Sequence, residues 1–122
     1  MTNDTRRWLF ALAALSAALA VIAGAFGAHG AANPKAAEWL RTGALYQMVH
    51  GVGALAIAQR APRIGWVLII GAAIFAGTLY AMALGGPRWL GAVTPIGGAL
   101  MIAGWLLLAF SATRRPGTPP HP

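Results

Sequence analysis

The polar side chains best placed to do chemistry in this 122-residue chain surround His50. His50 lies in an uncharged stretch, residues 42–59, that also contains Tyr46 and Gln47. On a helix, these two residues lie four and three positions before His50, so all three occupy one face or adjacent faces. An ionisable group inside an apolar membrane segment is costly, and it is by default a candidate functional site. His50 therefore defines the first candidate site.

Other polar residues lie towards the ends of neighbouring apolar segments and extend this site. In one interpretation they bond to one another and to carbonyls freed by a proline, and they fix the registry of the helices. In the other, they line a small pocket open to the outer face, which binds a small molecule, a quinone or a lipid headgroup, or passes protons through His50. The candidate polar intramembrane site comprises His29, Tyr46, Gln47, His50, Thr78, Tyr80, Thr94 and Pro95.

Metal, cofactor and enzyme chemistry have little support in the sequence. The chain has no cysteine, which excludes disulfides, thiolate metal sites and cysteine nucleophiles. A haem or metal held by His29 and His50 is disfavoured, because the two lie at different predicted depths and no third ligand is evident. The only acids, Asp4 and Glu38, fall in predicted aqueous segments. We therefore predict no metal site, no cofactor and no enzymatic activity.

The composition is that of a membrane protein. Hydrophobic residues make up 58% of the chain and charged residues only 9%, and the mean hydropathy is +0.65. The net charge of +7 comes largely from basic pairs at the ends of apolar runs, such as Arg6 with Arg7 and Arg60 with Arg63. No basic stripe is interleaved with aromatic residues, so the charge favours membrane orientation over nucleic-acid binding.

The elements that must position the polar residues are four apolar spans. A membrane helix needs about 20 largely apolar residues. Runs of this kind predict an all-α, four-helix transmembrane bundle, an integral membrane protein with one domain at residues 1–114. The spans are residues 8–28, 37–59, 64–85 and 88–112, and the Pro-rich tail at residues 115–122 is expected to be disordered.

The boundaries of two of these spans, the second and the fourth, are harder to assign. The second is the weakest, because it contains Gln47 and His50 and is long enough only if Trp39 and Leu40 join it. In the fourth, either Thr94 caps a helix that starts at Pro95, or a longer helix is kinked there. We favour the kink, because residues 87–94 would otherwise be an apolar stretch without structure at the membrane face.

The basic residues also predict an orientation. Six Lys and Arg flank the two termini and the middle loop, against three on the other side, Lys35, Arg41 and Arg88. The positive-inside rule then places both termini in the cytoplasm of a multi-pass inner-membrane protein. The first span resembles a signal peptide but is expected to stay uncleaved, because it is long and three spans follow. The tryptophans at 8, 39, 66 and 89 lie near span ends, as membrane anchors do.

Small residues, which recur at four-residue spacing in the first and third spans, predict where the helices touch. Lipid gives helices no hydrophobic drive to associate, so close backbone packing and interhelical hydrogen bonds hold them together. The predicted packing positions are Ser16, Ala20, Gly24 and Ala28 in the first span, Ala73, Gly77 and Ala81 in the third, and Gly97, Gly98 and Gly104 in the fourth.

Four stretches together resemble a known family. They are GAFGAHG at residues 24–30, YQMVH at 46–50, FAGTLY at 75–80 and TPIGG at 94–98, the last followed by GW at 104–105. The combination is similar to the small bacterial membrane proteins called domain of unknown function 423, relatives of the eukaryotic transmembrane protein 256. The resemblance implies a four-span inner-membrane protein and no established activity. It places motif positions on Phe26, His29, Tyr46, His50, Tyr80, Thr94 and Pro95.

Two classes of function remain after these observations. The first is a non-enzymatic accessory or structural protein whose partners are the lipid bilayer and either further copies of itself or a larger membrane complex. The alternative is a small-molecule or proton carrier that uses a polar site around His50 in the outer half of the membrane. Short loops leave little room for a transport path within one chain, which favours the first class.

Overall fold

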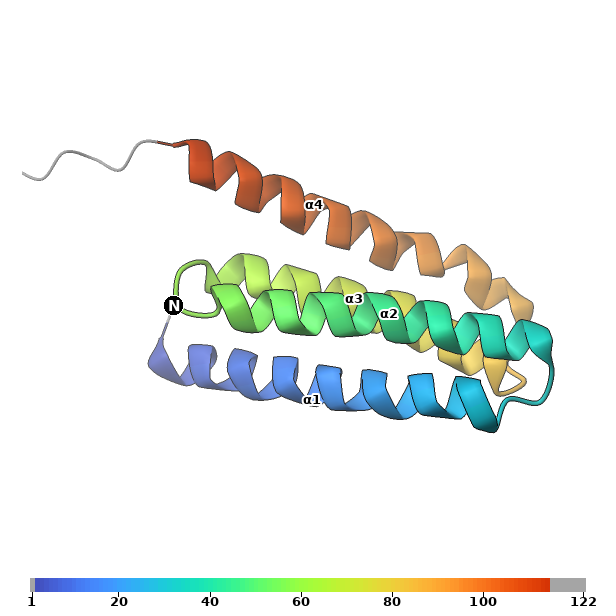
Figure 1. Cartoon of the computed structure of the whole chain (residues 1–122). Coiled ribbons are helices and arrows are strands. Elements are labelled where there is room, and N and C mark those ends of the chain that lie inside the picture. Colours follow the sequence, from blue (N-terminus) through green and yellow to red (C-terminus); the bar gives the residue numbers. More distant parts are fainter. Residues whose placement is uncertain (1, 115–122) are drawn as a thin grey trace, which may run out of the picture.

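The computed structural model describes residues 2–114, and they form an all-α bundle (Figure 1). Four long helices follow one another along the chain: α1 (Asn3–His29), α2 (Pro34–Ile57), α3 (Pro62–Ala83) and α4 (Thr94–Thr113). A short 3-10 helix, η1 (Arg88–Ala92), precedes α4. The predicted four-helix class is confirmed, while the predicted disordered tail, residues 115–122, lies outside the described residues.

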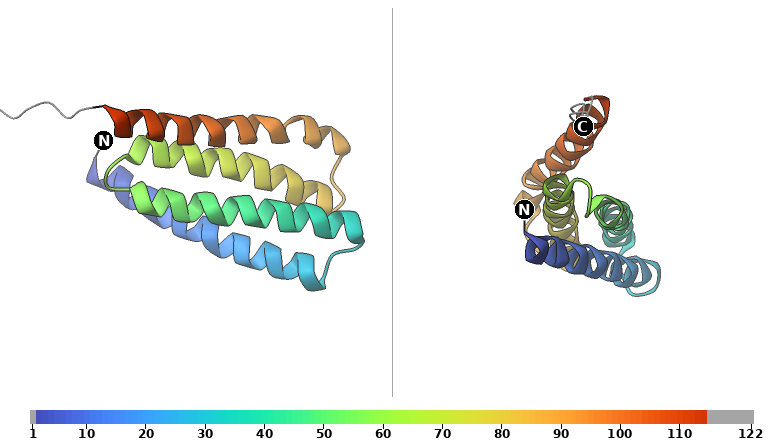
Figure 2. Two further views of the ribbon diagram at one scale, coloured as in Figure 1. Left: turned by 45° about the horizontal axis from the view of Figure 1, so that its top comes forward. Right: turned by 90° about the vertical axis from the view of Figure 1, so that its left-hand side faces the viewer.

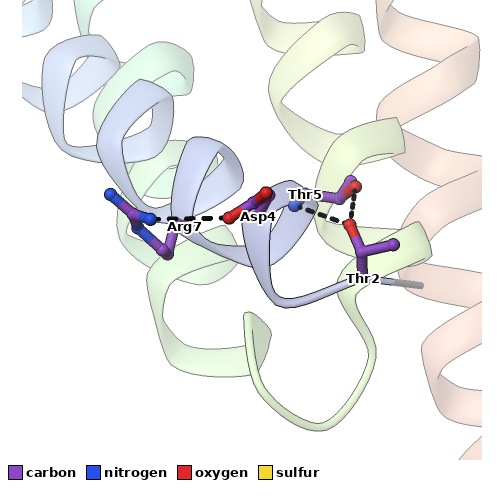
Figure 3. Close-up of polar contacts among 4 residues, drawn as sticks. All are labelled: Thr2, Asp4, Thr5 and Arg7. Carbon is purple, nitrogen blue, oxygen red and sulfur yellow. Dashed lines mark hydrogen bonds and ion pairs between the residues drawn. The ribbon is translucent and has the colours of Figure 1, made fainter.

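Local sequence signals set where the helices begin. The Thr2 hydroxyl accepts a hydrogen bond from the amide of Thr5 at 3.1 Å and caps α1 (Figure 3). Asn33 caps α2 in the same way, accepting from the amide of Ala36 at 2.8 Å, and Pro34 follows it in the first turn. The turn predicted at residues 30–34 is therefore present.

The helices are arranged as a three-helix core with a fourth helix on its edge. α1, α2 and α3 pack side by side, and α4 lies against α3 on the side away from α1 (Figure 2). α3 is thus the central element, because it contacts both α2 and α4 over much of its length. α3 and its neighbours α2 and α4 carry the hydrogen-bonded side chains of the candidate site.

Most of the core is made of small side chains. The largest fully buried side chains are Leu9 and Leu68, and Ala13, Ala54 and Ala72 are also fully buried. Such residues let helix backbones come close enough for dispersion contacts to hold a bundle in lipid. The bundle is therefore held by backbone proximity rather than by large apolar side chains.

Three helical stretches are long and apolar enough to cross a membrane: α1, α3 and the segment Arg88–Thr113. Among the described helices, α2 does not meet the same measure of composition. It nevertheless has 24 residues and packs along both α1 and α3, so it occupies the same layer as they do. The polar residues that lower its hydropathy are those of the candidate site.

The fourth helix corrects the interpretation of Pro95. The α-helix begins at Thr94, and the chain before it forms η1 rather than the first half of a longer kinked α-helix. Pro95 lies in the first turn, where its missing N–H breaks no helical bond. Thr94 does not cap the helix either, because its hydroxyl donates back to the carbonyl of Leu90 at 3.1 Å.

The small-residue stripe of α1 lies largely at a helix contact. Ser16 and Ala20 are buried, and Gly24 faces Ala44 of α2. Ala28 departs from the predicted seam because it is exposed. Gly27 takes its place: a Cβ there would stand 3.0 Å from the Cβ of Leu40.

The predicted packing positions of α3 do not lie at a close helix contact. Ala73 is exposed, Gly77 faces open space and Ala81 is only half-buried. The contact surface of α3 instead includes Ala72 and Ala76, which are buried. An Ala- and Gly-rich helix carries several stripes at four-residue spacing, so spacing does not decide which one faces a partner.

The α4 stripe packs on α3. A Cβ at Gly97 would overlap the backbone of Phe75 and Gly71, and one at Gly104 would lie 2.6 Å from the Leu68 side chain. Gly98 is looser, with only the Phe75 ring near it at 3.9 Å. Gly97 is therefore the closest approach of the two backbones.

A matched pair of glycine substitutions tests this contact. Gly97→Ala forces α4 away from α3 and should lower the free energy of unfolding by about 1–3 kcal/mol, the usual range for overpacking. Gly77→Ala has open space and should leave stability unchanged or raise it by up to about 1 kcal/mol through helix propensity. Unfolding of the two variants in detergent compares them. Equal effects would contradict the glycine contact.

The charged residues separate to the two ends of the bundle. The N-terminus, the α2–α3 turn and the end of α4 meet at one end, which carries Arg6, Arg7, Arg60, Arg63 and Arg114 (Figure 1). We call this the arginine end. Lys35, Arg41 and Arg88 lie towards the opposite end.

The orientation is testable by cysteine labelling, because the chain has no cysteine of its own. Ala32→Cys and Pro87→Cys at the opposite end should react with an impermeant maleimide in intact spheroplasts. Gln59→Cys at the arginine end serves as the control and should react only after permeabilisation. The reverse pattern would contradict the orientation that the basic residues predict.

Candidate intramembrane polar site

His50 joins α2 to α4 through both of its ring nitrogens. Its side chain is 5% exposed. Nδ1 lies 2.6 Å from the backbone carbonyl of Tyr46, one turn earlier, and Nε2 lies 2.9 Å from the indole nitrogen of Trp105. A carbonyl only accepts and an indole N–H only donates, so the proton of His50 resides on Nδ1 and the ring is neutral. His50 is thus fully hydrogen-bonded.

A glycine makes room for this contact. The Trp105 ring lies against Gly53, one turn after His50, where a Cβ would stand 2.9 Å from the indole. The ring of Trp105 also meets that of His50 edge-on, with centroids 5.7 Å apart. The indole of α4 can therefore reach the imidazole only because α2 has no side chain at this position.

Gln47 joins α2 to α3 in a similar way, through a hydrogen bond to an aromatic residue that lies next to a glycine of α2. The Tyr80 hydroxyl donates to Oε1 of Gln47 at 2.7 Å. The Tyr80 ring lies over Gly43, one turn before Gln47, where a Cβ would stand 2.6 Å from the ring. α2 thus carries two acceptor side chains, each one turn from a glycine that seats an aromatic donor from a neighbouring helix.

Two threonines join α3 to α4 near the opposite end. The hydroxyls of Thr78 and Thr94 lie 2.6 Å apart, and both side chains are buried. Thr78 also reaches the carbonyl of Ile74 at 2.9 Å, and Thr94 reaches that of Leu90 at 3.1 Å. One hydroxyl donates to the other and the second donates to its own helix, so the pair is satisfied in either direction.

The predicted site is therefore divided into three interhelical links. His50 lies about 24 Å along α2 from its start at Pro34, while Thr94 begins α4 near that same end. His29 and Pro95 join none of the links, and both are exposed. Within residues 2–114, no group of three or more His, Cys, Asp or Glu side chains gathers to hold a metal ion.

Two open, mostly apolar grooves flank these links. One, of about 380 Å³, runs between α2 and α4 and is lined by Tyr46, His50, Phe75 and Trp105 among others. The other, of about 490 Å³, lies between α1 and α3 and includes Gln47 and Tyr80. Each groove is thus lined in part by two polar side chains that are hydrogen-bonded to each other: His50 with Trp105, and Gln47 with Tyr80.

Sequence reasoning missed Trp105, Phe75, Gly43 and Gly53. Phe75 packs against Tyr46, with ring centroids 4.8 Å apart. A signal for Trp105 was present, because it is the tryptophan that lies away from a predicted span end. An indole N–H within hydrocarbon needs an acceptor, and His50 is the strongest acceptor predicted at a similar depth.

These observations define a helical integral membrane protein, and comparison with known proteins gives its family. Residues 23–98 match the family described as "Protein of unknown function (DUF423)". A UPF0382 membrane protein of Staphylococcus saprophyticus is 46% identical over 107 residues, covering 80% of this chain and 89% of the relative. The UPF0382 inner membrane protein YgdD of Escherichia coli is 36% identical over 121 residues, covering 90% and 92%.

The chain therefore belongs to the DUF423 family, as its motifs implied. A UPF0382 membrane protein of Haemophilus influenzae, 39% identical over 113 residues, is a further relative, with 83% of this chain and 90% of the relative covered. No solved structure matches the chain. The names of the relatives and the apolar helices support a membrane location.

Removing the indole donor tests the link between α2 and α4. Trp105→Phe keeps an aromatic ring over Gly53 but leaves Nε2 of His50 without its partner. We expect the free energy of unfolding to fall by about 1 kcal/mol, typical of an interhelical hydrogen bond in a membrane. Trp89→Phe is the control, because Trp89 is 66% exposed and should be neutral. Equal unfolding curves for the two variants in detergent would contradict the link.

Proposed function

We propose that this protein is a non-enzymatic structural or accessory protein of the inner membrane, with both termini in the cytoplasm. The observation that supports the proposal is that the buried polar side chains form hydrogen bonds between helices. Gln47 of α2 accepts a hydrogen bond from Tyr80 of α3, and His50 of α2 accepts one from Trp105 of α4. Thr78 of α3 bonds to Thr94 of α4. These groups hold helices together and leave no free acid–base pair to act on a substrate.

The position of α4 supports a role in assembly. It packs on α3 at the edge of the three-helix core and leaves its other side open (Figure 2). Ile102, Leu106 and Phe110 on α4 are each more than 60% exposed. The turns at residues 30–33 and 58–61 are too short to form a separate binding domain. We therefore propose that the protein packs with further copies of itself or against a larger membrane complex.

The alternative function is a small-molecule or proton carrier around His50. The groove beside Tyr46 and Trp105 is the feature that favours it. A proton arriving at Nε2 of His50 would face the N–H of Trp105, so passage through this ring requires the interhelical link to break first. Because this hydrogen bond would have to break, we favour the structural role over the carrier.

Two measurements on the purified protein separate these functions. In liposomes with an internal pH dye, we expect proton flux no greater than in empty liposomes, for the wild type and for His50→Ala alike. In native membranes solubilised in mild detergent, crosslinking and mass spectrometry should find a defined homo-oligomer or a defined larger complex. A wild-type flux abolished by His50→Ala would contradict the proposal, and so would a strict monomer without bound protein.

A further inference from the structure

Three arginines converge on one hollow at the arginine end. Arg6 comes from the first turns of α1, and Arg60 and Arg63 flank the turn between α2 and α3. Together with residues 61, 62 and 64 they line a hollow of about 370 Å³. The start of α1 lies at the same end of the bundle as this turn (Figure 1), so two segments far apart in the sequence bring their cations together.

Within residues 2–114, no carboxylate side chain lines this hollow. The two acids of the chain are Asp4 and Glu38. Asp4 pairs with Arg7 at 3.4 Å on an exposed part of α1 (Figure 3), and Glu38 pairs with Lys35 at the opposite end. Within residues 2–114, neither acid forms an ion pair with Arg6, Arg60 or Arg63. Like charges gathered in this way repel unless an anion is bound between them.

Arg6 is the least exposed of the three arginines. Its Nε is buried and has no hydrogen-bond partner within residues 2–114. A buried guanidinium N–H without an acceptor is unfavourable, and arginine is the side chain best suited to hold two oxygens of one phosphate. An oxyanion in the hollow would neutralise the cluster and accept hydrogen bonds from the guanidinium groups that line it.

An adjoining hollow identifies the kind of molecule that carries the anion. It has about 540 Å³, shares Arg6, and is lined by polar Asn3 and Gln59 and by apolar Trp8 and Phe10 among others. Trp8 and Phe10 are 64% and 55% exposed. Exposed aromatic residues near the ends of membrane helices are typical of the membrane–water interface. A cationic hollow beside an exposed aromatic wall suits an amphiphile with a phosphate head and an apolar body.

We propose that the arginine end binds the phosphate headgroup of an anionic phospholipid. Arg6, Arg60 and Arg63 hold the phosphate oxygens, and Trp8 and Phe10 contact the glycerol and upper acyl region. Basic pockets between membrane helices bind anionic headgroups by the same chemistry. This site goes beyond the assembly role proposed above and does not depend on it.

The test compares phosphatidylglycerol, phosphatidylcholine and inorganic phosphate as ligands of the full-length protein in detergent. Native mass spectrometry counts the bound lipid, and thermal unfolding reports stabilisation. The test variant is Arg60→Gln/Arg63→Gln, whose two side chains are exposed. The matched control is Arg41→Gln/Arg88→Gln at the opposite end, which removes the same charge from two equally exposed positions.

We expect the wild type and the control to bind phosphatidylglycerol, and the test variant to bind it about tenfold or more weakly. Phosphatidylcholine and inorganic phosphate should bind far less well to all three proteins. Equal weakening in the test variant and the control would overturn the proposal, because it would mean a general charge effect. Inorganic phosphate that binds as well as the lipid would also overturn it, in favour of a soluble anion.

Discussion

The structure depends on one constraint of the hydrocarbon layer: a polar side chain there must find its partner within the protein. α2 carries two such side chains, Gln47 and His50, in the middle of a segment that must lie between α1 and α3. Each receives a hydrogen bond from an aromatic residue of a neighbouring helix, Tyr80 or Trp105. The least apolar helix is therefore the one that fixes the positions of α3 and α4 relative to itself.

Glycine makes these bonds geometrically possible. Gly43 and Gly53 lie one turn from Gln47 and His50 and leave room for the rings of Tyr80 and Trp105 to approach α2 closely. The backbones of α3 and α4 likewise come close together at Gly97. Near this contact, the hydroxyl oxygens of Thr78 and Thr94 lie 2.6 Å apart. Small residues bring the helices together, and the polar pairs fix their registry.

The sequence predicted the helical class, the separation of charge between the two ends, and most of the polar residues that join helices. Those features follow from composition and from rules that act locally, such as capping and the positive-inside bias. It did not predict which small-residue stripe of α3 faces a neighbour, because spacing alone does not distinguish Gly77, which faces open space, from Ala76, which is buried. It also treated the polar residues as one site, since their pairing depends on helix rotation. Pro95 was misassigned because a proline suits the start of a helix as well as a kink.

The central claim is that His50 is a structural clamp: both of its ring nitrogens are hydrogen-bonded, and it joins α2 to α4. Nitrogen-15 NMR of histidine-labelled protein in lipid bilayers tests it most directly, with His50→Gln used to assign the signal. The hydrogen bonds to Tyr46 and Trp105 predict a neutral ring with its proton on Nδ1 and an unprotonated Nε2. A proton on Nε2, or a mixture of the two tautomers as in a freely exposed imidazole, would contradict the clamp.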